Sequence, residues 1–91
     1  MDHLILHALP ETDMSFSSSR RNALDESKPL EHRASHARSC AMLVAQKWNV
    51  TRGDVIEKIH GMCGIDLHSP TSSFDLEHAM KYLELIRANG I

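Results

Sequence analysis

Apolar residues recur at helical spacing along the chain between residues 30 and 48. They alternate steps of four and three, which places them on one face of an α-helix. Around residues 40–45 the sequence is apolar on every side of that helix, so more than one of its faces must be covered. Ser27 and Pro29 stand before the run, where a cap and a first-turn proline are favoured. The residues of the stripe are Leu30, Ala34, Ala37, Ala41, Val44 and Trp48.

Two shorter helices are predicted after this one. Thr51 and Asp54 have the spacing of a capping box at the start of the second helix. Ser72 and Asp75 repeat that spacing before a third helix, which is expected to stop at residues 89–90, an Asn-Gly pair. The expected buried positions of the two helices are Val55, Ile56, Ile59, Leu76, Ala79, Met80, Leu83 and Ile86.

The start of the chain differs in character from residues 28–91. Its later part is rich in serine and charge, a composition that cannot offset the entropy lost on ordering, so it is expected to form a loose link. Its apolar tip, Leu4, Ile5 and Leu6, is expected to dock on the body or on a second subunit. The sequence therefore predicts a mainly α protein with a small three-helix domain over residues 28–91. An extended or partly disordered arm over residues 1–27 would precede it, and a homodimer is expected.

Composition narrows the classes of function. The chain has 91 residues, which leaves room for one domain, and its formal charge of −2 argues against a polyanion as the main partner. It has no signal peptide pattern and no apolar run of about 18 residues, which predicts a cytoplasmic protein that does not enter a membrane. No glycine-rich phosphate loop and none of the usual hydrolase or metalloprotease motifs occurs. We therefore expect no enzymatic activity and no cofactor.

Residues 41–59 resemble the helix-turn-helix motif of DNA-binding proteins. The apolar positions agree, with Trp48 just before the turn. The motif usually has glycine where this chain has Asn49, and only Arg52 and Lys58 are available as phosphate contacts on the second helix. Two helices joined by a tight turn produce the same apolar spacing. A helix-turn-helix DNA-binding regulator is therefore the alternative function, and nucleic acid the less favoured partner.

Two histidine–cysteine pairs have spacings that suit a metal. His36 with Cys40, and His60 with Cys63, would each reach one ion from a helix face, and tetrahedral zinc accepts two of each residue. Cys40 lies in the most apolar stretch, however, and the combination matches no established zinc motif. Buried reduced thiols and solvated histidines explain the set better. No metal site is expected.

The chain has more apolar surface than three short helices can bury, and contiguous exposed apolar area marks an interface. We expect a partner-binding surface in which an apolar stripe enters a groove and arginines at the rim set the orientation. The expected residues are Met42, Leu43, Arg33, Arg38, Tyr82 and Leu85. Basic side chains form a further candidate patch for an acidic protein groove: Arg20, Arg21, His32, Arg33, His36 and Arg38.

A short chain with a helical body, a separate N-terminal arm and surplus apolar surface resembles the small helical anti-activators of bacteria, such as those of quorum sensing. The resemblance is one of size and organisation. Those proteins bind a transcription factor and block its dimerisation or its DNA binding. The resemblance implies a small regulatory protein that inhibits a transcription factor or another protein partner by occupying its surface.

Overall fold

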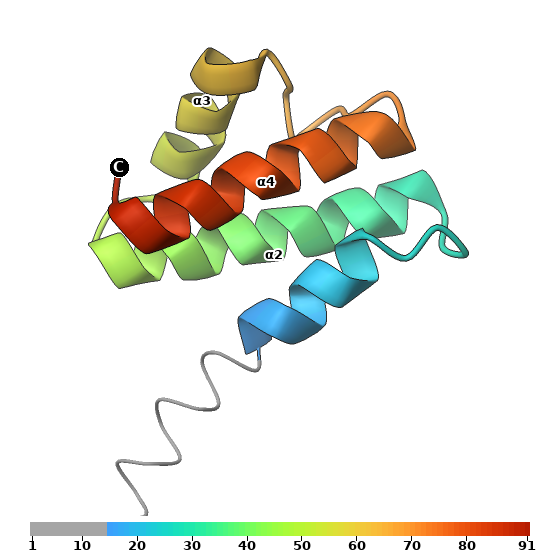
Figure 1. The fold of residues 1–91 in the computed structure, drawn as a ribbon, viewed down its shortest axis with the longest axis horizontal. Helices are drawn as coiled ribbons and strands as arrows, with labels where there is room; N and C mark the ends of the chain where they lie inside the picture. Colours follow the sequence, from blue (N-terminus) through green and yellow to red (C-terminus); the bar gives the residue numbers. More distant parts are fainter. Residues whose placement is uncertain (1–14) are drawn as a thin grey trace, which may run out of the picture.

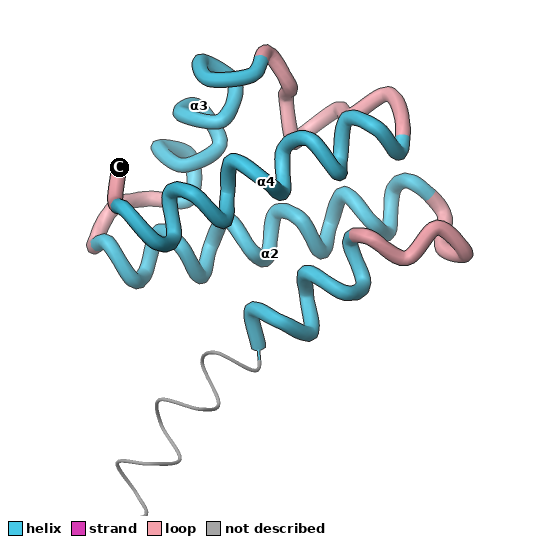
Figure 2. Tube along the Cα trace, in the orientation of Figure 1, coloured by secondary structure: helices cyan, strands magenta, loops and turns pink. Residues whose placement is uncertain are grey.

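The computed structural model describes residues 15–91, and every regular element within that range is a helix (Figure 1, Figure 2). A short helix over residues 15–23 comes first. It is followed by α2 (Leu30–Trp48), α3 (Arg52–Cys63) and α4 (Ser73–Asn89). The prediction of a mainly α chain is confirmed, together with the three helices expected after residue 28. The apolar tip of the expected arm, Leu4, Ile5 and Leu6, lies outside the described residues.

The helices form a bundle around α2. α2 and α4 lie side by side and run in the same direction, with α3 on one flank and residues 15–23 on the other (Figure 1). At the shared C-terminal end, the Lys47 ammonium donates a hydrogen bond to the Arg87 carbonyl at 2.8 Å, and the Trp48 ring lies against Gly90. No element within residues 15–91 covers the outer side of α4, where every third or fourth residue is exposed. This side of α4 is therefore open to solvent in the described part of the chain.

Most of the core is built from apolar positions that the sequence predicted. All eight positions expected to be buried on α3 and α4 are buried, and so are Ala34, Ala37, Ala41 and Val44 on α2. At the ends of the stripe expected on α2, Leu30 is only half-buried and Trp48 is 36% exposed. Leu67, in the loop between α3 and α4, is also buried. Burying one large aliphatic side chain contributes about 1.5–3 kcal/mol before entropy is subtracted. The small residues on α2 let the neighbouring helices approach it closely, because alanine adds little volume between them.

The start of α3 has the capping box that the sequence predicts, whereas the start of α2 lacks the predicted cap. The Thr51 hydroxyl accepts a hydrogen bond from the Asp54 amide at 3.0 Å, and the Asp54 carboxylate accepts one from the Thr51 amide at 3.2 Å, so the capping box is confirmed. The cap predicted from Ser27 is wrong. Its hydroxyl donates to the Asp25 carboxylate at 2.6 Å, and α2 begins after Pro29 with no side-chain cap.

Replacing the capping threonine tests how much this end stabilises the fold. Thr51→Ala is expected to lower the free energy of unfolding by about 1 kcal/mol, because the Asp54 amide loses its hydrogen-bond acceptor. Thr51→Ser, which keeps the hydroxyl, should lie within a few tenths of a kcal/mol of the parent protein. Urea denaturation followed by circular dichroism measures both variants. Equal stability of the alanine variant and the parent would show that the cap contributes nothing.

The serine-rich segment corrects the expectation of a loose link. Residues 15–23 form a helix that runs antiparallel to α2, and its Phe16 and Ala23 are buried in the core (Figure 1). Arg20 forms an ion pair with Glu84 at 2.8 Å. The physical reason lies in spacing: two apolar residues seven positions apart share one helix face, so this segment buries apolar area despite its polar composition.

No helix within residues 15–91 combines the length and the apolar character that a membrane span requires.

Candidate protein-binding surface

The outer side of α4 carries a row of aromatic and apolar side chains, which we call the α4 row: Phe74, His78, Tyr82 and Leu85. The steps between them are four, four and three, so they line one face of the helix. Phe74 is 67% exposed and Leu85 is 51% exposed, the two highest values among the large apolar side chains of residues 15–91. The opposite face of α4 supplies five core residues. α4 is therefore apolar on its inner face and along one outer stripe.

The rings of the α4 row contact one another along the helix. The His78 ring centroid lies 5.5 Å from that of Phe74 and 5.5 Å from that of Tyr82, with the planes tilted by 45° and 35°. Tyr82 is half-buried and packs against the core, which anchors the row at its middle. Because each ring restricts the next, the surface is partly ordered before any partner arrives, and binding loses less side-chain entropy.

Both ends of α4 are fixed, so the row stands on a rigid element. At the N-terminus the Ser72 hydroxyl accepts a hydrogen bond from the Asp75 amide at 3.1 Å. The Asp75 carboxylate also accepts bonds from the Thr71 hydroxyl at 2.7 Å and the Thr71 amide at 3.0 Å. At the C-terminus the bond from Lys47 satisfies the Arg87 carbonyl. A cation near the last turn also suits the negative end of the helix dipole.

The hydrogen bonds that Thr71 and Ser72 make with Asp75 make the free energy of unfolding depend on pH, and the direction of this dependence can be predicted. The side-chain hydrogen bond from Thr71 is the largest cause that lowers the pKa of Asp75 below its ordinary value of 3.8. Ser27 lowers the pKa of Asp25 in the same way. A carboxyl with a lowered pKa stabilises the fold above its ordinary pKa, and that stabilisation is lost as pH falls through the folded value. The free energy of unfolding should therefore drop below about pH 4.

Asp75→Asn and Asp25→Asn together should make the free energy of unfolding fall less steeply below about pH 4, which we call the acid limb, because neither residue can then be protonated. Urea unfolding at a series of pH values down to about pH 2 measures the effect. Glu31→Gln, on the exposed side of the first turn of α2, serves as the control for removing one negative charge. An acid limb of unchanged steepness in the Asp25/Asp75 double variant would contradict the assignment.

The structure does not bring the six predicted partner-binding residues together on one surface. Tyr82 and Leu85 belong to the α4 row. Met42 is exposed on the outer face of α2, turned away from the buried side on which α4 packs. Leu43 is half-buried and packs against the core. Sequence reasoning missed Phe74, although its spacing of four from His78 and eight from Tyr82 was a usable signal.

Arg33 lies in the interior and not at the rim of a surface, which corrects the expectation for this residue. It is only 3% exposed, and its Nε donates a hydrogen bond to the Ala23 carbonyl at 2.9 Å. The bond satisfies a carbonyl at the end of the helix over residues 15–23, where a positive charge is favourable. One terminal nitrogen of the guanidinium is buried without a hydrogen-bond partner. Arg33 therefore fastens this helix to α2 and is not available to a partner.

Three arginines of the expected basic patch, Arg20, Arg33 and Arg38, are bonded to other parts of the chain. Arg38 donates from Nη1 to the Leu67 carbonyl at 2.8 Å and so holds the loop between α3 and α4. Arg20 is paired with Glu84. The sequence could not reveal these contacts because each joins residues far apart in the chain.

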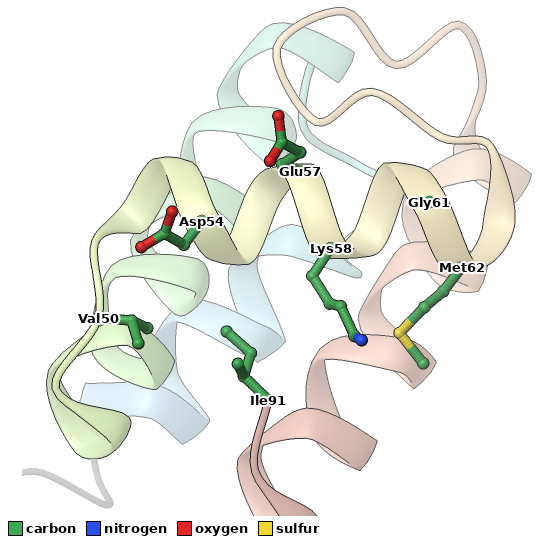
Figure 3. Close-up of a pocket in the computed structure, with 7 residues that line it drawn as sticks. All are labelled: Val50, Asp54, Glu57, Lys58, Gly61, Met62 and Ile91. Carbon is green, nitrogen blue, oxygen red and sulfur yellow. The ribbon is translucent and has the colours of Figure 1, made fainter.

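Residues 41–59, which resemble the helix-turn-helix motif in sequence, contain a left-handed turn residue and a mixed charge pattern. Asn49 adopts the left-handed conformation, with φ 58° and ψ 46°, so it takes the backbone shape for which the motif uses glycine. Lys58 and Met62 extend from α3 toward Ile91, whereas Asp54 and Glu57 project away from it (Figure 3). These side chains belong to a shallow groove lined by Val50, Asp54, Glu57, Lys58, Gly61, Met62 and Ile91. Arg52 is exposed at the first turn of α3.

The two histidine–cysteine pairs do not converge. The Cys40 side chain is fully buried and its thiol donates to the Phe16 carbonyl at 3.9 Å, while the Cys63 thiol donates to the Ile59 carbonyl at 3.2 Å. Burial raises the pKa of Cys40 to about 12, which keeps it protonated and unreactive at neutral pH. Across residues 15–91, no group of three or more potential metal-ligating side chains comes together.

Comparisons with known protein families, with curated proteins and with solved structures found no match to this chain.

Proposed function

We propose that this protein is a small regulatory protein that acts by binding another protein through the α4 row. The observation that carries the proposal is the line of ring contacts from Phe74 through His78 to Tyr82, with Phe74 and Leu85 exposed on a helix whose two ends are fixed. A large aromatic side chain that is exposed to water contributes little to the core, and a partner that covers it removes apolar surface from water. Surface clusters of this kind are typical of interfaces, where aromatic residues supply most of the binding free energy.

The mechanism we propose is steric. α4 would enter a groove of the partner, with Phe74 and Leu85 as anchors about 17 Å apart at ~1.5 Å per residue, and Tyr82 between them. The partner's own interface would then be occupied. A transcription factor that must dimerise or bind DNA is the partner class that the size and organisation of the chain favour, and the proposed compartment is the cytoplasm.

Matched surface variants test this proposal. The parent protein, Phe74→Ser, Leu85→Asp and the control Gln46→Ser would each be used to capture proteins from a lysate of cells that make the chain. Gln46 is exposed on α2, on the side opposite its buried positions. We expect a protein that is retained by the parent and the Gln46 variant and is lost with both α4 variants. Isothermal titration with the purified partner should show affinity reduced by at least tenfold for each, since every 1.4 kcal/mol corresponds to about a factor of ten.

The proposal fails if every variant captures the same proteins in the same amounts. It also fails if binding is lost with the Gln46 variant as readily as with the α4 variants, because the α4 row would then have no special role. Circular dichroism of each variant excludes unfolding as the cause.

DNA binding is a second candidate, favoured by the left-handed Asn49 turn between α2 and α3. Against it stands the exposed surface of α3, where the charges of Arg52 and Lys58 are balanced by Asp54 and Glu57. Fluorescence anisotropy with labelled double-stranded DNA over a salt series tests it. Binding through phosphates should weaken steeply as salt rises and should fall further in Arg52→Ala. Absence of binding at low salt removes this candidate.

A further inference from the structure

We propose that a second copy of this chain docks on the α4 row, so that two α4 helices pair antiparallel about a twofold axis near the middle of the row. This inference uses the surface of the proposed function but does not require that function to be correct. A homodimer is the simplest occupant, because a twofold interface brings one patch against the same patch of the other copy. Such a patch must be complementary to itself when it is reversed.

The apolar members of the row meet this requirement. Phe74 stands near the start of α4 and Leu85 near its end, so each would contact the other residue type in the reversed copy. His78 and Tyr82 would face each other across the axis in the same alignment. Both pairs are therefore centred at positions 79 to 80. The exposed aromatic ring at each end gains an aliphatic contact, and the central rings pack against one another.

The charged flank of the row points to the same alignment. Glu77 and Lys81 are exposed and four residues apart, so they lie along one side of the row. In an antiparallel helix pair the same side of each helix faces the other copy. Glu77 of one copy therefore lies opposite Lys81 of the other, twice per dimer, and this pair is centred at position 79. An alignment shifted by one helical turn would lose these opposite-charge contacts.

The length of α4 limits the area of this interface. α4 has 17 residues and is about 26 Å long at ~1.5 Å per residue. Two helices of that length bury about 1,000 Å² in total, at the lower end for a specific interface. We therefore expect a weak, reversible dimer of the kind seen for transient complexes.

This pairing has a regulatory consequence. The dimer covers the same residues that a protein partner would use, so self-association and partner binding compete. At high concentration most of the chain would form a dimer that cannot bind the partner. At low concentration the chain would be monomeric, and its α4 row would be open to the partner. Partner affinity measured at low protein concentration would then be higher than at concentrations where the dimer forms.

A charge-swap cycle tests the dimer with the purified full-length chain in sedimentation velocity. Glu77→Lys alone and Lys81→Glu alone each put like charges opposite one another, and each should raise the dissociation constant at least fivefold at low salt. The double variant Glu77→Lys/Lys81→Glu restores opposite charges and should recover dimerisation. An equimolar mixture of the two single variants should form a heterodimer. Phe74→Ser should abolish the dimer, and Gln46→Ser should leave it unchanged.

A monomer at all concentrations up to about 1 mM would overturn the inference, because an interface of this size should be populated there. A dimer that responds equally to the Gln46 and Phe74 variants would also overturn it. So would the absence of recovery in the double charge variant. None of these results bears on the partner-capture experiment, which remains informative for a monomeric protein.

Discussion

Phe16→Ala is expected to lower the free energy of unfolding by about 3 kcal/mol and to expose the thiol of Cys40. The Phe16 side chain is one of two buried residues of the helix over residues 15–23, and its carbonyl accepts the Cys40 thiol. The Phe16 ring also lies 4.3 Å from the Arg87 guanidinium, a cation–π contact that would be lost. The part of this helix that the structure describes, residues 15–23, is held to the body by its buried face, so removing the ring should release the segment.

Thiol labelling under native conditions measures this release. Cys63→Ser in every sample removes the second, half-buried thiol. The Phe16→Ala variant should then react with a disulfide reagent at least tenfold faster than its parent. Phe16→Leu keeps an apolar side chain of similar size and serves as the control, with slow labelling. Equal labelling rates in all three proteins would show that the segment does not protect Cys40.

Leu83→Ala should be the most destabilising change in α4, with an expected loss of about 3 kcal/mol. The Leu83 side chain is fully buried, so its truncation leaves a cavity in the core. Leu85→Ala, two residues further along the same helix, should cost less than about 0.5 kcal/mol because that side chain is half exposed and lies outside the core. Urea denaturation measures both. Similar losses for the two variants would mean that Leu85 belongs to the core and that the outer stripe of α4 is not a free surface.

Much of the fold could be predicted from the sequence because local rules agreed with one another. The apolar stripes on α3 and α4 have helical spacing, and the capping pairs at residues 51 and 72 mark where these helices start. The two helices and their buried residues could therefore be predicted from the sequence. The helix over residues 15–23 could not be predicted in the same way. Its serine-rich composition opposes order, and the residues that hold it lie ten or more positions away in the chain: Arg33, Cys40, Glu84 and Arg87.

The candidate site was predictable only in part. Tyr82 and Leu85 follow from helical spacing, since they fall on a stripe separate from the buried one. Arg33 was misplaced because nothing in its immediate sequence distinguishes an exposed arginine from one that bonds the end of another helix. Spacing assigns residues to a face, whereas tertiary packing decides which face remains open.

Photo-cross-linking from position 74 tests the claim that the α4 row is an interaction surface most directly. Phe74→benzoylphenylalanine places a reactive ketone in the row, and Gln46→benzoylphenylalanine places the same group on the outer side of α2. After irradiation in a lysate of cells that make the protein, position 74 should form an adduct with another polypeptide chain, identified by mass spectrometry, and position 46 should form none. Adducts in equal yield from both positions, or from neither, would contradict the account.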